Sequence, residues 1–163
     1  MNSTPSKTTS RPGGRSCTLL TAKRNGTKHA GIQNGIKFWI IGPHQSTADS
    51  DTRRIHDACL VIKALLGERA CLFAGDASDA NLEYIANNTK NYCNDILHAS
   101  HHASIEGAHL EFVKKCNAKY TLISTAAGKY ENVPHPTALR RYKENTAQDV
   151  RRTDVDGTWK WTF

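Results

Sequence analysis

Apolar residues recur along this chain in two patterns, which predict two kinds of secondary structure. Short runs rich in β-branched and aromatic residues are typical of strands, and apolar residues spaced three or four positions apart are typical of helices. The segments predicted as strands are 17–21, 36–42, 58–66, 70–74, 95–98, 120–124, 149–153 and 158–163. The segments predicted as helices are 78–87, 107–116 and 136–145. Because strands come first and then alternate with helices, we expect an α/β fold with a mixed sheet.

Glycine and polar residues predict how these segments are connected. The segment 24–35 holds three glycines and is predicted as turn and loop, and 44–54 is predicted as a polar loop. Residues 67–69 are predicted to close one hairpin, and residues 154–157 a second one. In the strand after that second turn, Trp159, Trp161 and Phe163 alternate with polar residues, so one face of this strand is expected to be buried.

The net charge of +7 comes entirely from the first quarter of the sequence. No Asp or Glu precedes Asp49, and the 15 basic residues after it balance the 15 acidic ones. We expect residues 1–16 to be a disordered, solvated basic leader and residues 17–163 to form the domain. A second interpretation is a basic arm that binds nucleic acid through residues such as Lys23, Arg24 and Lys28.

The five cysteines are widely spaced, and no C-x-x-C pair occurs among them. An odd count, with several members inside apolar runs, predicts reduced, buried thiols in a cytoplasmic protein. No apolar run approaches the roughly 18–20 residues that a membrane-spanning helix needs, so we expect no contact with a membrane.

Polar residues that suit metal binding and hydrolysis follow three successive predicted strands. Asp76 comes after the strand 70–74, the pair His101-His102 after 95–98, and Ser124 ends 120–124, with His135 in the next loop. The carboxyl ends of strands form the rim where α/β sheets bind ligands. Carboxylate oxygen and imidazole nitrogen are ligands of borderline and hard metals.

Each of these residues also has a purely structural interpretation. Asp76 could cap the following helix, the His-His pair could bind backbone groups, and His135 could be held between two prolines by the geometry of its loop.

The order of these motifs resembles the metallo-β-lactamase superfamily, and within it the branch of ComEC-like hydrolases of DNA uptake. The resemblance spans about residues 35–163 and rests on Gly75-Asp76-Ala77, LHASHHAS (97–104), YTLIS (120–124), VPHP (133–136) and RRTDVDGTWKW (151–161). It implies a metal-dependent hydrolase that uses Zn²⁺ or Mn²⁺ and cleaves a phosphodiester, with nucleic acid as substrate. It also implies one half of an αββα sandwich, a mixed sheet with helices packed on one face.

The same resemblance assigns roles to individual residues. Asp76 is similar to the carboxylate that bridges two metal ions, and His101 or His102 to the last histidine ligand, with His101 preferred. The catalytic set is then Asp76, His101 and His135, and the metal ligands are Asp76, His101 and His102. Substrate contacts are implied for Ser104, Ser124 and His135.

The sequence departs from the superfamily in lacking its H-x-H-x-D-H segment. The remaining ligands are too few for a tight two-metal site, since even one catalytic zinc normally has three protein ligands. We therefore expect a homo-oligomer or a partner chain that supplies the other half of the fold. The alternatives are a non-catalytic binding or scaffold module that has lost its metals, and nucleic-acid binding through the basic N-terminal segment.

Overall fold

The computed structural model describes residues 28–51, 54–126 and 128–160. The predicted leader 1–16, the predicted strand 17–21, Lys23 and Arg24 lie outside the described residues, and so do Trp161 and Phe163.

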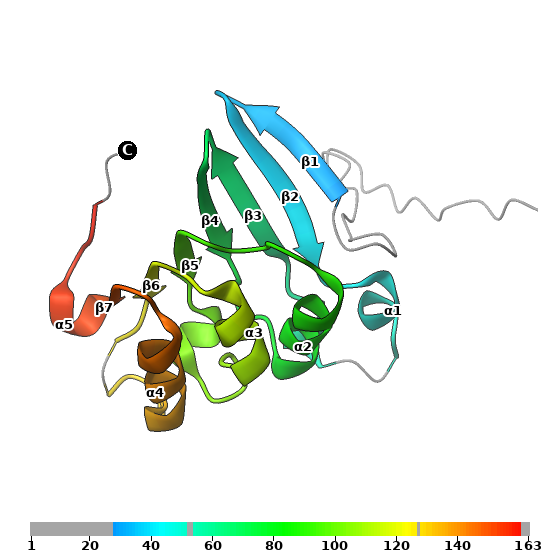
Figure 1. The fold of residues 1–163 in the computed structure, drawn as a ribbon. Coiled ribbons are helices and arrows are strands. Elements are labelled where there is room, and N and C mark those ends of the chain that lie inside the picture. Colours follow the sequence, from blue (N-terminus) through cyan, green and yellow to red (C-terminus); the bar gives the residue numbers. More distant parts are fainter. Residues whose placement is uncertain (1–27, 52–53, 127, 161–163) are drawn as a thin grey trace, which may run out of the picture.

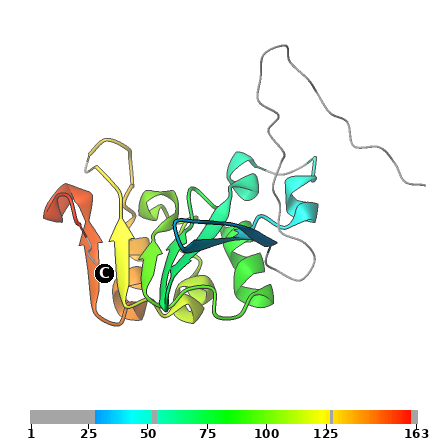
Figure 2. The same ribbon diagram turned by 90° about the horizontal axis from the view of Figure 1, so that it is seen from above.

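A seven-stranded sheet forms the centre of the molecule, and its strands lie side by side in sequence order (Figure 1). The first four strands pair antiparallel, and the fourth to the seventh pair parallel. Seen from above, β5 to β7 form one end of the sheet and the hairpin of β1 and β2 lies at the other (Figure 2). The strands are β1 (Lys28–Gln33), β2 (Ile36–Gly42), β3 (Val61–Leu66), β4 (Arg69–Phe73), β5 (Ile96–His98), β6 (Tyr120–Ile123) and β7 (Asp149–Arg152).

Three helices cover one face of this sheet: α2 (Asp79–Asn88), α3 (Leu110–Cys116) and α4 (Pro136–Asn145). Two single-turn helices, α1 (Gln45–Ala48) and α5 (Thr153–Asp156), and two 3₁₀ turns, Ile55–Ala58 and Ser100–Ala103, complete the described elements. The expected α/β class, with a mixed sheet and helices, is therefore confirmed.

The hydrophobic core lies between the sheet and these three helices. Alternate strand residues point to the same face of a sheet, and the core side chains that the strands place on the covered face are at most 1% exposed. Full burial of one such side chain contributes about 1.5–3 kcal/mol. The core side chains include Ile41, Val61, Leu72, Leu97 and Ile123 of the strands, with Leu82 and Ile85 of α2, Phe112 of α3 and Tyr142 of α4.

The other face of the sheet carries apolar side chains over which the described residues place no helical layer. Phe73, next to the fully buried Leu72, is 46% exposed, and Leu66 is 42% exposed. Two grooves with volumes of about 300 and 420 Å³ lie on this open face. Contiguous exposed apolar surface is typical of a binding surface.

Two connections differ from the predictions. The segment 24–35 is not simply a loop, because β1 occupies Lys28–Gln33 and pairs with β2. The turn between them is Asn34-Gly35, both with positive φ (50° and 81°), the backbone that Asn-Gly favours in a tight hairpin. Within the predicted polar loop 44–54, His44 caps the short helix α1 by accepting a hydrogen bond from the Ser46 amide.

The predicted C-terminal hairpin is also wrong within the described residues. The chain forms α5 where the tight turn was expected, and residues 157–160 pair with no strand. Asp154 and Asp156 explain the change. Both carboxylates bind Arg152, through its guanidinium (2.6 and 3.0 Å) and its backbone amide (2.8 Å), and they hold a helical turn after β7.

The prediction that all cysteines are reduced is wrong for two of them. Cys93 and Cys116 form a disulfide that links the segment before β5 to the end of α3. Their separation of 23 residues in sequence gave no sign that the fold brings the two Cα atoms to 4.7 Å. Cys59 and Cys71 are free. No helix in the described parts of the chain is long and apolar enough to cross a membrane.

Candidate functional site

The candidate site lies where β4 and β5 end, at the carboxyl edge of the parallel strands. The turn Gly75-Asp76 follows β4, and the 3₁₀ turn Ser100–Ala103 follows β5. The two are joined by the His101 amide, which donates a hydrogen bond to the Gly75 carbonyl at 2.9 Å. Gly75 has a φ of +53°, and a Cβ there would lie 2.9 Å from Cys59 Sγ, so both backbone and space favour glycine.

Asp76 and His102 face each other across this edge. His102 Nε2 lies 3.7 Å from Asp76 Oδ1, and both side chains are 46% exposed. His102 Nδ1 lies 2.7 Å from the Ser124 carbonyl oxygen. Because that oxygen only accepts, Nδ1 carries a proton, and in a neutral ring Nε2 would present its lone pair to the carboxylate. A cation or a further proton between these two acceptors would relieve their repulsion.

The backbone that presents His102 is strained. His101, His102 and Ala103 have φ values of 47°, 54° and 63°, three successive non-glycine residues in the left-handed region. Each such residue costs of the order of 1–3 kcal/mol and persists where its surroundings fix it, commonly at functional sites. Here the fixing bonds are the His101 amide to Gly75 and the His135 amide to the Ala103 carbonyl at 2.9 Å.

His101 lies beside this pair but in a different environment. Its Nδ1 is buried without a hydrogen-bond partner, and its ring contacts that of His56 in a tilted arrangement, with 4.3 Å between centroids and 39° between planes. Burial, and after it the nearby His56, lowers the pKa of His101, while Asp76 acts in the opposite direction. The structure thus places His102, rather than the preferred His101, opposite Asp76.

The other predicted site residues make local structural contacts. His135 Nδ1 accepts from the Thr137 amide at 3.1 Å and caps α4. Ser104 Oγ accepts from the Gly107 amide at 3.1 Å and is nearly buried. Ser124 contributes its carbonyl, through which it orients His102. Of the basic residues suggested for nucleic acid, only Lys28 lies among the described ones, in β1.

Two residues without a predicted role also belong to this site. The His56 ring contacts that of His101, and Cys59 Sγ accepts a hydrogen bond from the Asp76 amide at 3.2 Å. Both come from the 3₁₀ turn and loop before β3, which Ser78 fastens by donating to the Asp57 carboxylate. The only sequence signal was a histidine in a polar segment, which does not indicate where that segment packs.

The described residues offer an incomplete set of metal ligands. Nowhere among these residues do three or more His, Cys, Asp or Glu side chains come together in a way that could hold a metal ion. Asp76 and His102 supply two donors of suitable chemistry, one fewer than a catalytic zinc normally receives from protein. Any metal site here therefore needs ligands from elsewhere.

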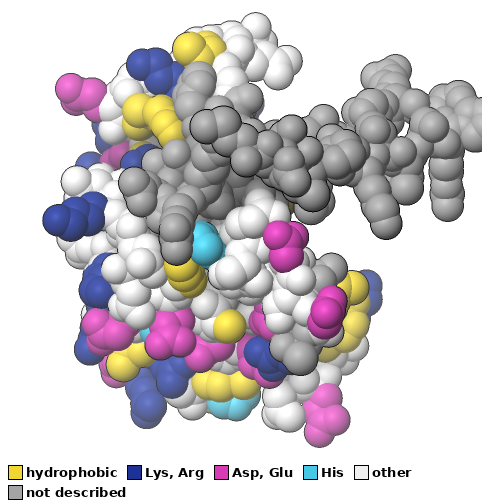
Figure 3. Space-filling model, turned by 90° about the vertical axis from the view of Figure 1, so that its right-hand side faces the viewer, with side chains coloured by type: hydrophobic (Ala, Val, Ile, Leu, Met, Phe, Trp, Pro, Cys, Tyr) yellow, Lys and Arg dark blue, Asp and Glu magenta, His cyan; other side chains and the backbone are white. Residues whose placement is uncertain are grey.

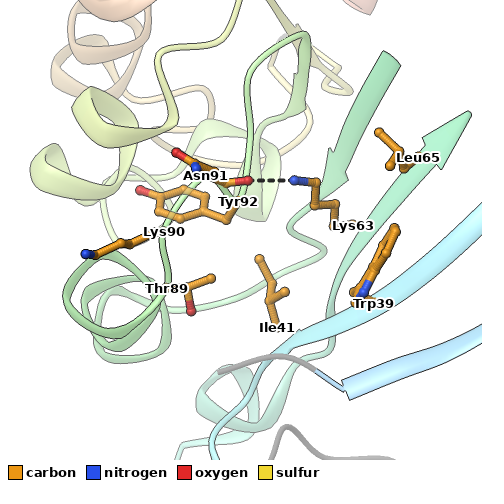
Figure 4. Close-up of a pocket in the computed structure, with 8 residues that line it drawn as sticks. All are labelled: Trp39, Ile41, Lys63, Leu65, Thr89, Lys90, Asn91 and Tyr92. Atoms are coloured by element: carbon orange, nitrogen blue, oxygen red, sulfur yellow. Dashed lines mark hydrogen bonds between the residues drawn. The ribbon is translucent and has the colours of Figure 1, made fainter. Parts of the chain in front are cut away.

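The surface near α1 and α2 and a separate cavity offer no second site of this kind. On the side of the molecule shown in Figure 3, basic and acidic side chains are interspersed. A cavity of about 230 Å³ lies between the end of α2 and strands β2 and β3 (Figure 4). Its lining contains no carboxylate and no histidine, and Lys63 closes it by donating to the Asn91 carbonyl at 2.6 Å.

A scan against models of protein families and a search of curated protein sequences both found no match to the chain.

Proposed function

We propose that this chain is one half of a metal-dependent hydrolase of the metallo-β-lactamase type, completed by a partner chain or by a second copy. The observation that carries the proposal is the Asp76–His102 pair, a carboxylate oxygen and an imidazole nitrogen 3.7 Å apart on an accessible sheet edge. Their donor atoms suit Zn²⁺ or Mn²⁺.

The surroundings of His102 support metal binding. Histidine ligands commonly donate their second ring N–H to a backbone carbonyl, which fixes tautomer and orientation. The Ser124 carbonyl does this for His102 at 2.7 Å. A divalent ion bound here would generate hydroxide from water near neutral pH and stabilise an attacked phosphoryl oxygen. The chain's own part is to hold Asp76 and His102 on two loops that the bond from the His101 amide to Gly75 fixes together.

The open sheet face supports the need for a second layer. One of its grooves is lined by β1, β2 and β3 and ends at Leu60. The Leu60 carbonyl would lie 3.2 Å from a Cβ placed on Gly75, so this groove adjoins the turn that carries Asp76. A polypeptide seated in it would cover apolar surface and bring further ligands to the same edge. Cleavage of a phosphodiester, with nucleic acid as the substrate, follows from the sequence resemblance alone. The expectation of a cytoplasmic location depended on reduced cysteines, and the Cys93–Cys116 disulfide does not support it.

A second candidate function is a non-catalytic binding module, which the incomplete ligand set of the described residues favours. In that case Asp76 and His102 form an ordinary surface ion pair, which contributes about 0–1 kcal/mol.

Metal titration separates the two functions. We expect wild-type protein to bind about one Zn²⁺ or Mn²⁺ per chain, and Asp76→Asn or His102→Gln to weaken binding about tenfold or more. Asp79→Asn, a carboxylate on α2 outside the site, is the matched control and should bind as wild type does. Hydrolysis of bis(p-nitrophenyl) phosphate by the metal-loaded protein is the second readout.

Failure of the wild type to bind metal both alone and together with any co-purifying chain, or equal binding by Asp76→Asn, would refute the hydrolase and leave the binding module. Binding that sharpens with protein concentration would identify a second copy as the source of the missing ligands.

A further inference from the structure

The cavity of about 230 Å³ beside the end of α2 has one wall that is built by strands β2 and β3 (Figure 4). Trp39 and Ile41 lie two positions apart on β2. Lys63 and Leu65 lie two positions apart on β3, and the register pairs Lys63 directly with Trp39. Because alternate residues share a face, these four side chains form one wall, in which an aromatic and a cationic side chain are neighbours.

The loop that follows α2 forms the opposite wall, through residues 89–92. Asn91 has a φ of 52°, a backbone conformation that Asn tolerates, and its carbonyl accepts a hydrogen bond from Lys63 Nζ at 2.6 Å. Tyr92 is 2% exposed, stacks on the ring of Phe112 and donates from its hydroxyl to the Phe112 carbonyl at 2.7 Å. Both walls are therefore fixed by the fold, and the cavity between them is already formed.

The ammonium of Lys63 has no anion of its own in the described part of the chain. Only Asp95 acts on it, and that carboxylate already binds Lys119 Nζ at 2.8 Å and lies 3.6 Å from the Arg69 guanidinium. Burial lowers the pKa of Lys63, while Asp95 acts in the opposite direction. A partly buried cation is stabilised when it is both hydrogen-bonded and paired, and here the Asn91 carbonyl supplies a hydrogen bond but no charge.

We propose that this cavity binds a small monocarboxylate with an apolar body, whose carboxylate pairs with Lys63 Nζ and whose body packs against Trp39, Ile41 and Leu65. Mostly apolar cavities with a few polar groups are typical of ligand sites. The volume lies below the roughly 300–1,000 Å³ of sites for drug-sized ligands, which favours a body of about one ring.

The lining also favours a carboxylate over a phosphate. It contains no acidic side chain, so nothing in it repels an anion. Lys63 reaches across the cavity, whereas Lys90 is exposed and points away from it (Figure 4). One inward ammonium suits a single negative charge, while a phosphate dianion with its additional acceptor oxygens needs more donors. The site uses neither Asp76 nor His102, so it does not depend on metal binding.

An NMR titration of the full chain tests the site, with 3-phenylpropionate as the probe and the indole N–H resonance of Trp39 as the signal. We expect saturable binding of one molecule per chain. The uncharged probe 3-phenylpropanamide has the same body and should bind at least about tenfold more weakly, because it lacks the charge-assisted bond to Lys63.

Three variants locate the binding of the acid. Lys63→Met keeps the length of the side chain but removes its charge, and should raise the Kd about tenfold or more. Lys63→Arg retains a cation and should stay within about threefold of wild type, which excludes misfolding as the cause of the loss. Lys143→Met removes the same charge from an exposed position on α4 and should leave the Kd unchanged.

The proposal is overturned if the wild type shows no saturable binding of 3-phenylpropionate, if acid and amide bind equally, or if Lys63→Met binds the acid as well as Lys143→Met does. Asp76→Asn, the variant that tests metal binding, should bind 3-phenylpropionate as the wild type does. The cavity and the metal site can therefore fail separately.

Discussion

Asp95 and Asp76 lie at opposite edges of the same parallel strands, and their carboxylates are satisfied to very different degrees. Asp95, directly before β5, is 4% exposed and accepts hydrogen bonds from the Ala70 amide and from Lys119 Nζ, both at 2.8 Å. Asp76, after β4, is half exposed, and among the described residues its carboxylate faces only His102 Nε2 at 3.7 Å.

The difference shows how one fold uses the same side chain for two purposes. A buried carboxylate is stable only when it is fully hydrogen-bonded, and it then fixes the strands that provide its donors. A half-exposed carboxylate opposite another acceptor gains little for the fold and keeps its oxygens available to a ligand. The amino edge of this sheet is accordingly a structural edge, and the carboxyl edge is the candidate site.

The largest expected effect is the loss of stability in Asp95→Asn. The amide would weaken charge-assisted bonds to Lys119 and would face the Ala70 amide with one acceptor fewer. We expect the free energy of unfolding to fall by about 2–3 kcal/mol, measured by urea denaturation at pH 7. The matched variant Asp76→Asn should change it by less than about 0.5 kcal/mol. Similar losses in the two variants would remove the distinction between the edges.

The pH dependence of stability should follow Asp95 as well. Burial alone would raise the pKa of Asp95, but the hydrogen bonds from Lys119 and Ala70, with the charges of Lys119 and Arg69, outweigh it and lower that pKa below its ordinary value of 3.8. The stability contributed by the carboxylate is thus fully present above pH 3.8 and is lost as the pH falls through the folded-state pKa.

Urea denaturation from pH 7 down to pH 2 tests this sign. The gap between wild type and Asp95→Asn should stay constant down to about pH 4 and narrow below it. A gap that widens on acidification would show that the carboxylate is not the stabilising form.

The sequence predicted those parts of the site that depend on one strand and the loop directly after it. Gly75-Asp76 and His101-His102 follow strands whose apolar pattern is unambiguous, and parallel pairing then brings the loops to one edge. α4 was predicted with the same bounds because Pro136 suits the first helical position. These features depend on local propensity and on the two-residue period of strands.

Contacts between distant segments could not be predicted in this way. The contact between the His56 and His101 rings depends on where a 3₁₀ turn packs, and the Cys93–Cys116 disulfide depends on the position of α3 over the sheet. Which of His101 and His102 lies opposite Asp76 depends on left-handed backbone angles, and the residue types His-His-Ala do not predict such angles. In each case the deciding term is tertiary packing.

The smallest predicted effect is a change in stability at the left-handed backbone of His102. It distinguishes a ligand-binding site from a loop whose side chains only stabilise the fold. A non-glycine residue in this region destabilises the fold by about 1–2 kcal/mol, and glycine would remove that strain. Glycine also has more conformational freedom in the unfolded chain, which offsets the gain by about 0.5–1 kcal/mol. His102→Gly should therefore stabilise the protein by about 0.5–1 kcal/mol in urea denaturation while abolishing the metal binding proposed for Asp76.

Asn117, which ends α3 with a φ of 46°, provides the control because it has the same backbone but lies outside the site. Asn117→Gly should stabilise by at most a few tenths of a kcal/mol, since Asn already tolerates this conformation, and should leave metal binding unchanged. If His102→Gly instead destabilised the fold, the contact with the Ser124 carbonyl would outweigh the strain. His102 would then be a structural residue like Asp95, and the carboxyl edge, like the amino edge, would serve the stability of the fold rather than ligand binding.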